Sequence, residues 1–175
     1  MTTVIGNQKF RLRRSGSGLG LFANEPFRAG ERIIEYTGER ISAEEADRRG
    51  GRYLFHVDAE HAIDASGREH LARYINHACR PNCEARQVGR RIFIYAKRAI
   101  ELGEELTYRY GGVYFRTFIA PVGCGCATCT RHAERSVTGM IIRPKVIAPC
   151  PPPSAAPRAA GNGRLAAPVR AGRAR

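Results

Sequence analysis

Short apolar runs separated by turn residues recur between residues 7 and 130, and one of them, residues 10–13, alternates apolar with polar side chains; this pattern predicts a series of β-strands. The predicted strands cover residues 10–13, 18–23, 31–36, 53–57, 61–64 and 92–95. The last run follows Val88 and a Gly89-Arg90 turn, which predicts a hairpin. Many short strands with little helix indicate a mainly β domain.

Helix signals are few and short. Ser42, followed three residues later by Glu45, forms a capping box that predicts a helix over residues 43–49, ended by a Gly-Gly pair. A weaker pattern predicts a second short helix over residues 69–75. Strands and helices do not alternate along the chain, so an α/β fold with a parallel sheet is disfavoured.

The chain beyond about Met140 has a different composition. Ala, Pro, Gly and Arg dominate it, and large apolar side chains are too few to offset the entropy of ordering, so disorder is predicted. The chain carries 29 Lys and Arg against 16 Asp and Glu, a formal charge of +13. Residues 135–175 contain basic but no acidic side chains. Such a tail fits either an anionic partner such as nucleic acid or a solvated arm.

No run of 18 apolar residues is present, and residues 1–14 lack the apolar stretch of a secretory signal. We therefore expect no membrane span and an intracellular protein, cytoplasmic if it is bacterial, with a nuclear or secreted-effector location left open. In a reducing compartment, six cysteines favour metal ligands or buried thiols over disulfides. Cys124, Cys126 and Cys129 fall within six residues, a spacing typical of a metal-ligand cluster.

Residues 73–83 concentrate two Asn, one His, two Cys and one Pro in a short span. Asn76 offers donors and an acceptor, and His77 offers two ring nitrogens, so the pair can bind a polar ligand or join two backbone segments. The glycine-rich run at residues 15–20 permits close approach of the backbone to a ligand, although a Gly-rich bend in a strand has the same composition.

Residues 103–111 end an apolar strand with two tyrosines. Tyr108 and Tyr110 share one face, because side chains alternate along a strand. Strand tyrosines usually pack with the hydroxyl at the surface, but facing inward they would suit a narrow channel that receives a lysine side chain. Glu104 and Glu105 are adjacent and point apart, so we interpret them as surface residues.

In this order and spacing, residues 15–20, 73–83 and 103–111 resemble the motifs of SET-domain protein-lysine methyltransferases. The resemblance implies a mainly β SET-domain fold of the β-clip type, with few short helices. It also implies a pseudoknot, in which residues 73–79 pass beneath the segment that ends at Tyr110. S-adenosylmethionine is then the expected cofactor, and a protein lysine the expected substrate.

The resemblance also assigns roles to single residues. Tyr110 matches the catalytic tyrosine, Tyr108 the position where Tyr or Phe limits the number of methyl groups added, and Tyr53 a third channel tyrosine. The residues implied to bind the cofactor are Ser17, Gly18, Leu19, Gly20, Tyr53, Arg73, Asn76 and His77. The hydroxyl of Tyr108 favours mono- or dimethylation, because it restricts the room for a methylated amine.

Cys124, Cys126 and Cys129 leave a tetrahedral zinc site one ligand short. Cys79 is the natural fourth ligand, and the set then resembles the post-SET zinc site of the family, which folds the following segment over the cofactor. Two residues separate Cys126 from Cys129, where many eukaryotic members have four, and the short form resembles bacterial members. The residue that closes over the adenine is left open among Tyr114, Phe115, Phe118 and His132.

The expected organisation is an N-terminal extension (1–6), a SET domain (7–111), a post-SET cysteine segment (112–132) and a basic tail (133–175). The predicted reaction transfers a methyl group from S-adenosylmethionine to the ε-amine of a lysine in a histone tail or another basic protein. Side chains proposed as an acidic lining for such a peptide are Asp58, Glu60 and Asp64.

Alternative hypotheses remain from other classes. The chain could be a non-catalytic adaptor whose Arg-rich tail binds nucleic acid, or a zinc-bound structural protein that does not bind S-adenosylmethionine. A Cys–His protease dyad with Cys79 or Cys83 as nucleophile is disfavoured, because no oxyanion loop is visible. A Rossmann-type methyltransferase is disfavoured for lack of βαβ units. The oligomeric state is left open.

Overall fold

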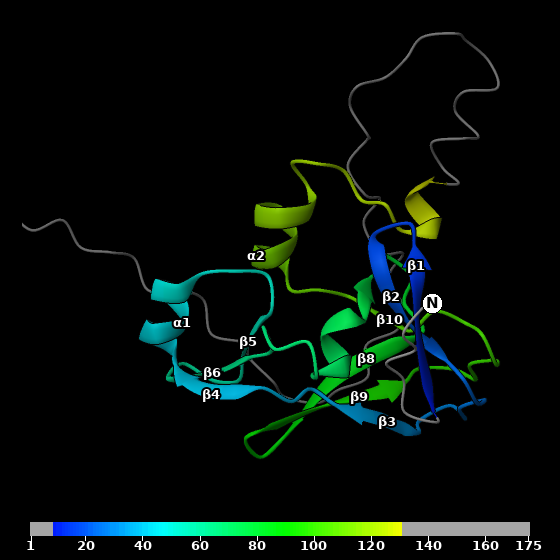
Figure 1. Cartoon of the computed structure of the whole chain (residues 1–175), viewed down its shortest axis with the longest axis horizontal. Coiled ribbons are helices and arrows are strands. Elements are labelled where there is room, and N and C mark those ends of the chain that lie inside the picture. Colours follow the sequence, from blue (N-terminus) through cyan, green and yellow to red (C-terminus); the bar gives the residue numbers. More distant parts are fainter. Residues whose placement is uncertain (1–8, 131–175) are drawn as a thin grey trace, which may run out of the picture.

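The computed structural model describes residues 9–130 of the 175-residue chain. The predicted N-terminal extension, the basic tail with Cys150, and the end of the post-SET segment with His132 lie outside the described residues. The strands are β1 Phe10–Ser15, β2 Gly18–Ala23, β3 Arg32–Glu35, β4 Glu39–Ser42, β5 Leu54–His56, β6 His61–Asp64, β7 Asn76–His77, β8 Cys83–Val88, β9 Arg91–Ala96 and β10 Thr107–Tyr108. The helices are α1 Ala43–Arg49, the 3₁₀ turn η1 Leu71–Tyr74, α2 Gly112–Tyr114 and the π-helical turn η2 Phe115–Ile119. The prediction of a mainly β domain with few short helices is confirmed (Figure 1).

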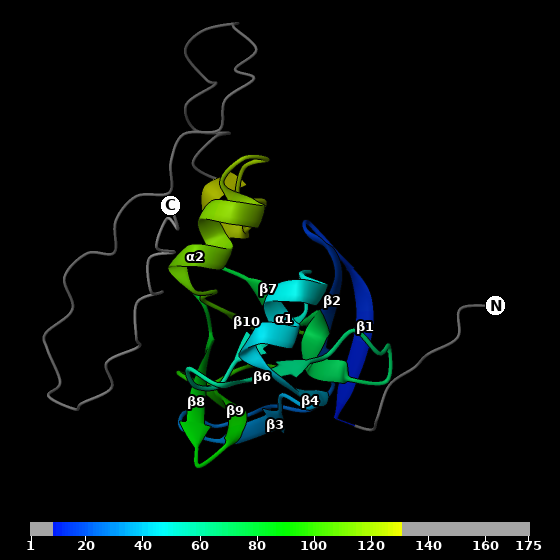
Figure 2. The same cartoon turned by 90° about the vertical axis from the view of Figure 1, so that its left-hand side faces the viewer.

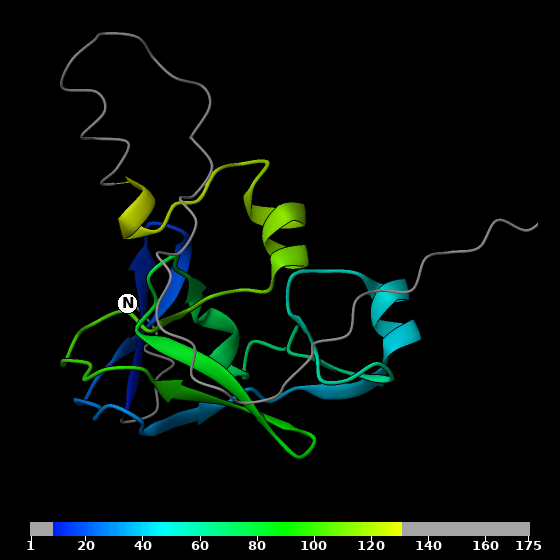
Figure 3. The same cartoon turned by 180° about the vertical axis from the view of Figure 1, so that it is seen from behind.

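The described strands form four small sheets: antiparallel β1–β2, antiparallel β3–β9–β8, antiparallel β4–β6–β5, and parallel β7–β10. The predicted hairpin is the β8–β9 pair, and Gly89 in its turn has φ +60, a conformation that favours glycine. The unit of β4, α1, β5 and β6 lies on one side of the molecule and the β1–β2 hairpin on the other, with α2 between them (Figures 1 and 3).

One apolar core joins these sheets. Its most deeply buried large side chains are Leu21, Ile75, Ile94, Ile100 and Leu106. On β9, Ile92, Ile94 and Ala96 are buried in this core, while Phe93 on the other face is buried beneath Arg32 and Arg91, which agrees with the unbroken apolar run of the strand. Because the core includes residues of β2, η1 and β9, the segments that carry the glycine-rich run and residues 73–83 are held against one scaffold.

The two motif segments lie side by side, as the resemblance predicts. Asn76 pairs with Thr107 and His77 with Tyr108 in the parallel β7–β10 pair, which is labelled in Figure 2. The buried side chain of Asn82 reinforces this pair: its amide donates to the Glu105 carbonyl at 2.8 Å, and its oxygen accepts from the Thr107 N–H at 2.9 Å. Two strands of two residues each are too short to be stable alone, so Asn82 supplies hydrogen bonds that the ladder lacks.

The helix prediction is confirmed for α1 and only in part for the second helix. The Ser42 hydroxyl accepts from the Glu45 N–H at 3.1 Å and caps α1, which ends at Gly50. The predicted helix over residues 69–75 is the shorter 3₁₀ turn η1. Neither β4 nor the α2–η2 segment was predicted. Within residues 9–130, no helix is long and apolar enough to cross a membrane.

Candidate active site

A cavity of about 1530 Å³ lies where the β1–β2 turn, the loop after α1, the β7–β10 pair and the α2–η2 segment meet. Its lining includes seven of the eight residues predicted to bind the cofactor: Ser17, Gly18, Leu19, Tyr53, Arg73, Asn76 and His77. It also includes the predicted channel tyrosines, Tyr108 and Tyr110. Gly20 does not line the cavity; a Cβ on it would lie 3.2 Å from the amide nitrogen of Asn76. Side chains predicted from four distant parts of the sequence therefore meet in one place.

Asn76 is the centre of a hydrogen-bond network on the glycine-rich side of the cavity. Its amide nitrogen lies 3.0 Å from the Ser15 hydroxyl, 3.1 Å from the Leu19 carbonyl and 2.8 Å from a carboxylate oxygen of Glu105. Two N–H groups thus have three acceptors within reach. The network ties the β1–β2 turn to β7, so it fixes the backbone that the resemblance assigns to the cofactor.

The interpretation of Glu105 as a surface residue is wrong. Glu104 and Glu105 do point apart, but only Glu104 forms a surface ion pair, with Arg98. The Glu105 side chain is half-buried and accepts from Asn76. Its role depends on a partner 29 residues away, which the local sequence pattern does not reveal.

Gly20→Ala tests whether this network supports cofactor binding. A Cβ at position 20 would lie 2.5 Å from Glu105 Oε1 and 3.2 Å from Asn76 Nδ2, so the network must shift. We expect the affinity for S-adenosylmethionine to fall about tenfold, because a displaced polar pair typically costs 1–3 kcal/mol. Calorimetric titration measures the affinity, and a thermal melt checks the fold. Unchanged affinity would show that the Asn76 network does not contribute to cofactor binding.

His77 joins the tyrosine segment to the cysteines. Burial and, second, the nearby Arg109 lower the pKa of His77 to about 4, so its ring is neutral near pH 7. Nδ1 accepts from the Tyr110 N–H at 3.1 Å. A neutral ring that accepts at Nδ1 carries its proton on Nε2, which lies 3.4 Å from the Cys79 sulfur. A displacement of Cys79 would therefore be transmitted to the Tyr110 backbone through the His77 ring.

Tyr108 and Tyr110 share one face, as predicted, with ring centroids 4.9 Å apart. The Tyr110 hydroxyl donates to the Ile75 carbonyl at 2.8 Å. Burial raises the pKa of both tyrosines far above the usual value, so both hydroxyls stay protonated. Because the Tyr110 proton is held by a carbonyl, its oxygen keeps its lone pairs for a group in the cavity.

Arg73 lies on the ring of Tyr53. The carbon at the centre of its guanidinium is 3.7 Å from the ring centroid, a close cation–π contact. One terminal nitrogen donates to the Ser66 carbonyl at 2.8 Å. Its Nε is buried and, within residues 9–130, has no hydrogen-bond partner. The arginine thus stiffens the Tyr53 wall and leaves a buried donor for which a bound molecule could supply the acceptor.

The α2–η2 segment extends the aromatic wall beyond Tyr110. Tyr114 packs edge-on against Tyr110 at 4.8 Å, and Phe118 packs against Tyr114 at 4.8 Å. Phe115 points the other way and lies 5.2 Å from the ring of His77. Of the three candidates within residues 9–130, Phe115 contacts the predicted cofactor residue His77 but does not line the cavity, whereas Tyr114 and Phe118 line it. The signal for this wall was the aromatic spacing 114, 115, 118 directly after Tyr110.

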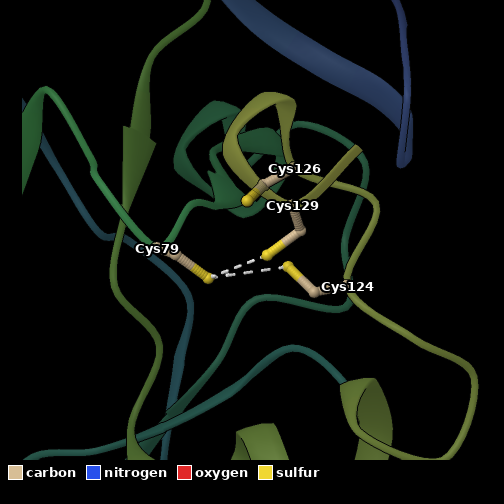
Figure 4. A group of neighbouring side chains, drawn as sticks. All are labelled: Cys79, Cys124, Cys126 and Cys129. Carbon is tan, nitrogen blue, oxygen red and sulfur yellow. Dashed lines mark hydrogen bonds between the residues drawn. The ribbon is translucent and has the colours of Figure 1, made fainter. Parts of the chain in front are cut away.

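Cys79, Cys124, Cys126 and Cys129 lie together, with sulfur atoms all within 4.8 Å of one another (Figure 4). The Cys79 sulfur is 3.6 Å from that of Cys129 and 3.8 Å from that of Cys124. A tetrahedral zinc with Zn–S bonds of about 2.3 Å needs sulfur pairs about 3.8 Å apart, so the donor set fits this metal. Cys83 is fully buried, outside the cluster, as predicted.

The electrostatics of one thiol agree with a metal site. Burial acts to raise the pKa of Cys126, but backbone hydrogen bonds at Cys79 and Cys129 outweigh it and lower the pKa to about 7. In contrast, burial raises the pKa of the Cys83 thiol to about 12. A metal binds thiolates, and the lowered pKa of Cys126 favours one, whereas burial raises the pKa of Cys124 as it raises that of Cys83.

The proposed acidic lining is not part of the cavity. Asp58 accepts from the N–H groups of Glu60 and His61 and so closes the β5–β6 turn. Asp64 is buried, accepts from Ser66 and pairs with Arg49. Asp58, Glu60 and Asp64 are all absent from the cavity lining, so this prediction is wrong. These carboxylates stabilise the β4–β6–β5 unit instead.

Comparison with known proteins agrees with the fold. The family model described as SET domain matches residues 18–111. Over 104 residues, 52% of this chain, it is 45% identical to "Histone-lysine N-methyltransferase, H3 lysine-4 specific" of Aspergillus oryzae and 47% identical to "Histone-lysine N-methyltransferase set1" of Dictyostelium discoideum. Over 146 residues, 71% of the chain, it is 38% identical to "Histone-lysine N-methyltransferase ASHH1" of Arabidopsis thaliana. The matched regions cover 8%, 7% and 30% of these relatives. The family match covers more than half of the chain and includes Asn76, His77, Tyr108 and Tyr110, so this chain belongs to the SET domain family.

Proposed function

We propose that this protein is a protein-lysine N-methyltransferase that uses S-adenosylmethionine. One observation carries the proposal: the aromatic channel formed by Tyr53, Tyr108 and Tyr110 and the polar pair Asn76 and His77 line the same cavity. The relatives' names as histone-lysine methyltransferases support the reaction class. A scaffold alone would not need two protonated, buried tyrosine hydroxyls beside a neutral histidine.

The residues of the channel prepare the lysine for attack. A free lysine has a pKa near 10.4, so its nucleophilic neutral form is rare at neutral pH. Tyr53, Tyr108 and Tyr110 surround the amine with apolar ring surface, and desolvation lowers the amine pKa. Arg73 and Arg109 act in the same direction through their positive charge. S-adenosylmethionine supplies an electrophilic methyl group on a positively charged sulfur.

Tyr110 contributes alignment, not proton transfer. Its proton is engaged by the Ile75 carbonyl, and its raised pKa excludes a phenolate near neutral pH. The hydroxyl oxygen can accept weak C–H···O contacts from a polarised methyl group. Catalysis then depends on orientation and preorganised dipoles, for which no paired carboxylates are needed.

Asn76 and His77 are proposed to hold the cofactor, with the backbone of the β1–β2 turn beside them. The four cysteines of the cluster are proposed to hold a structural zinc that fixes the segment after Tyr110. Cys79 is two residues from His77, so the metal would anchor the cofactor side of the cavity and the aromatic wall together. The basic tail remains a proposed contact for nucleic acid.

Tyr108→Phe is expected to raise the number of methyl groups added per lysine. The Tyr108 hydroxyl stays protonated because burial raises its pKa, and the residue lines the cavity, so the hydroxyl can hold the amine or a water beside it. Its removal frees space for a methylated amine, and a mono- or dimethylated product should shift towards di- and trimethyllysine. Mass spectrometry of a substrate peptide measures the distribution. An unchanged distribution would contradict this role for Tyr108.

Transfer of labelled methyl groups to a mixture of core histones and bacterial lysate proteins tests the proposed function. Label should appear on lysine with the intact protein and be lost with Tyr110→Phe. Removal of residues 140–175 should leave turnover on a short lysine peptide, whereas an adaptor would lose its function. Binding of S-adenosylmethionine without transfer to any lysine would contradict the proposed activity.

A further inference from the structure

The charged side chains that line the cavity are mostly basic. The five basic ones are Arg52, Arg73, Arg86, Lys97 and Arg109. The acidic ones are Asp47 and Glu84. Glu84 is already paired with Arg86, which leaves Asp47 to face the other basic groups. The lining therefore carries an excess of positive charge, five basic side chains against two acidic ones.

The carboxylates near the loop after α1 are occupied elsewhere. Arg49 pairs with Glu39, Glu45 and Asp64 on the outer side of the β4–α1 unit. Arg52, three residues later, is exposed and has no carboxylate partner within residues 9–130. Asp47 lines the same cavity but forms no ion pair with Arg52, so a substrate carboxylate could pair with this arginine.

Ring contacts place Arg52 at the outer end of the channel. The carbon at the centre of its guanidinium lies 5.8 Å from the ring centroid of Phe118. Phe118 contacts Tyr114, and Tyr114 contacts Tyr110, each at 4.8 Å. Two aromatic rings therefore separate Arg52 from the predicted catalytic tyrosine. Residues that flank a lysine in the channel would lie near this arginine.

A positive lining affects the two parts of a peptide differently. It favours the neutral form of the lysine amine, which is the form that reacts. It repels a flank rich in Lys and Arg and attracts a flank rich in Asp and Glu. A basic histone tail would meet repulsion on both sides of its lysine, and no acidic groove compensates, since Asp58 and Asp64 lie outside the lining.

We infer that the preferred substrate is a protein segment in which the target lysine is flanked by acidic residues, and that Arg52 determines this specificity. The inference rests on the proposed lysine methyltransferase function and names its substrate class. Arg52 acts on the flank, while the aromatic channel selects the lysine itself. The histone substrates named for the relatives belong to those proteins and have the opposite charge in their flanks.

Three peptide libraries test this inference with the full-length protein and labelled S-adenosylmethionine. Each has a central lysine and differs in its flanks, which contain Asp and Glu, Ser and Ala, or Arg; lysine is left out of the basic flanks because acetylating it to block its methylation would remove its charge. We expect kcat/KM to be highest for the acidic library and lowest for the Arg-containing one. The acidic preference should weaken with added salt, since exposed charges are screened.

Arg52→Glu should reduce the acidic-to-neutral ratio of kcat/KM about fivefold, the scale of an exposed ion pair. Arg52→Lys should retain most of the preference, because it keeps the charge. Arg90→Glu is the matched control: it changes the net charge equally in the β8–β9 turn, outside the cavity lining, and should leave the ratio unchanged.

Two results would overturn the inference, and only the second would also reject the proposed methyltransferase function. Faster methylation of the neutral or Arg-containing library, or a ratio that Arg52→Glu does not change, would reject the acidic substrate class and leave the methyltransferase function intact. Methylation of none of the libraries, with S-adenosylmethionine bound, would reject the proposed function and this inference with it.

Discussion

Replacing Tyr110 with Phe is expected to lower kcat about 100-fold, the scale found when one preorganised polar group at a reacting centre is removed. The substitution deletes the hydroxyl that donates to the Ile75 carbonyl and keeps the ring packed between His77 and Tyr114. Affinity for S-adenosylmethionine should change by less than about threefold, because the Asn76 network is not touched. Single-turnover methyl transfer and calorimetric titration measure the two quantities separately.

Tyr95→Phe is the matched control for this substitution. Tyr95 lies on β9 outside the cavity lining, with Arg86 over its ring, and its loss of a hydroxyl should leave kcat unchanged. A Tyr110→Phe protein that retains wild-type kcat would remove Tyr110 from the catalytic residues. A protein that loses cofactor affinity to the same extent as kcat would make Tyr110 a structural residue instead.

The features that local sequence predicted are those with local causes. The Ser42 cap of α1 depends on an N–H three residues away, and the turn at Gly89 depends on the backbone freedom of one residue. The apolar run of β9 follows from burial on both strand faces, of Ile92 and Ile94 on one and Phe93 on the other. Each signal is complete within a few positions, so it is visible before the chain folds.

Features set by distant partners were missed or placed wrongly. β4 contains only one buried residue, Ile41, and is a strand because it pairs with β6. Glu105 belongs to the site because Asn76 reaches it, and Asp64 is excluded from the cavity because Arg49 and Ser66 hold it. The charge of a residue does not indicate whether its side chain faces the cavity or another part of the protein. The sequence therefore could not show that Asp58, Glu60 and Asp64 lie outside the cavity lining.

The cofactor and channel residues were located by resemblance more than by pattern. Asn76 and His77 occupy only two residues of strand, and hydrophobic periodicity carries no information over such a length. Their meeting with Thr107 and Tyr108 is a contact between segments 31 residues apart. The cysteine cluster is an intermediate case, because its three late members are close in sequence while Cys79 joins them only in the fold.

Loss of zinc is expected to abolish methyl transfer and to lower the melting temperature by about 10 °C or more, roughly 2–3 kcal/mol for a domain of this size. Cys126→Ser removes one of four sulfur ligands and should reduce bound zinc from one per chain to a small fraction. The cluster also contains Cys79, whose sulfur lies 3.4 Å from the His77 ring that holds the Tyr110 backbone. The disturbance should therefore reach both the cofactor side and the channel.

Cys83→Ala separates a metal effect from general destabilisation. Cys83 is fully buried, and its thiol lies 3.4 Å from the Asn82 oxygen, outside the cluster, so its loss should cost stability without loss of zinc. Metal content by elemental analysis, melting temperature and transfer rate should fall together in Cys126→Ser, whereas metal content should remain at one per chain in Cys83→Ala. Full activity after chelation, or one zinc retained in Cys126→Ser, would reject a structural zinc at this cluster. Full activity without the metal would also mean that packing of Phe115 against His77 is enough to hold the aromatic wall.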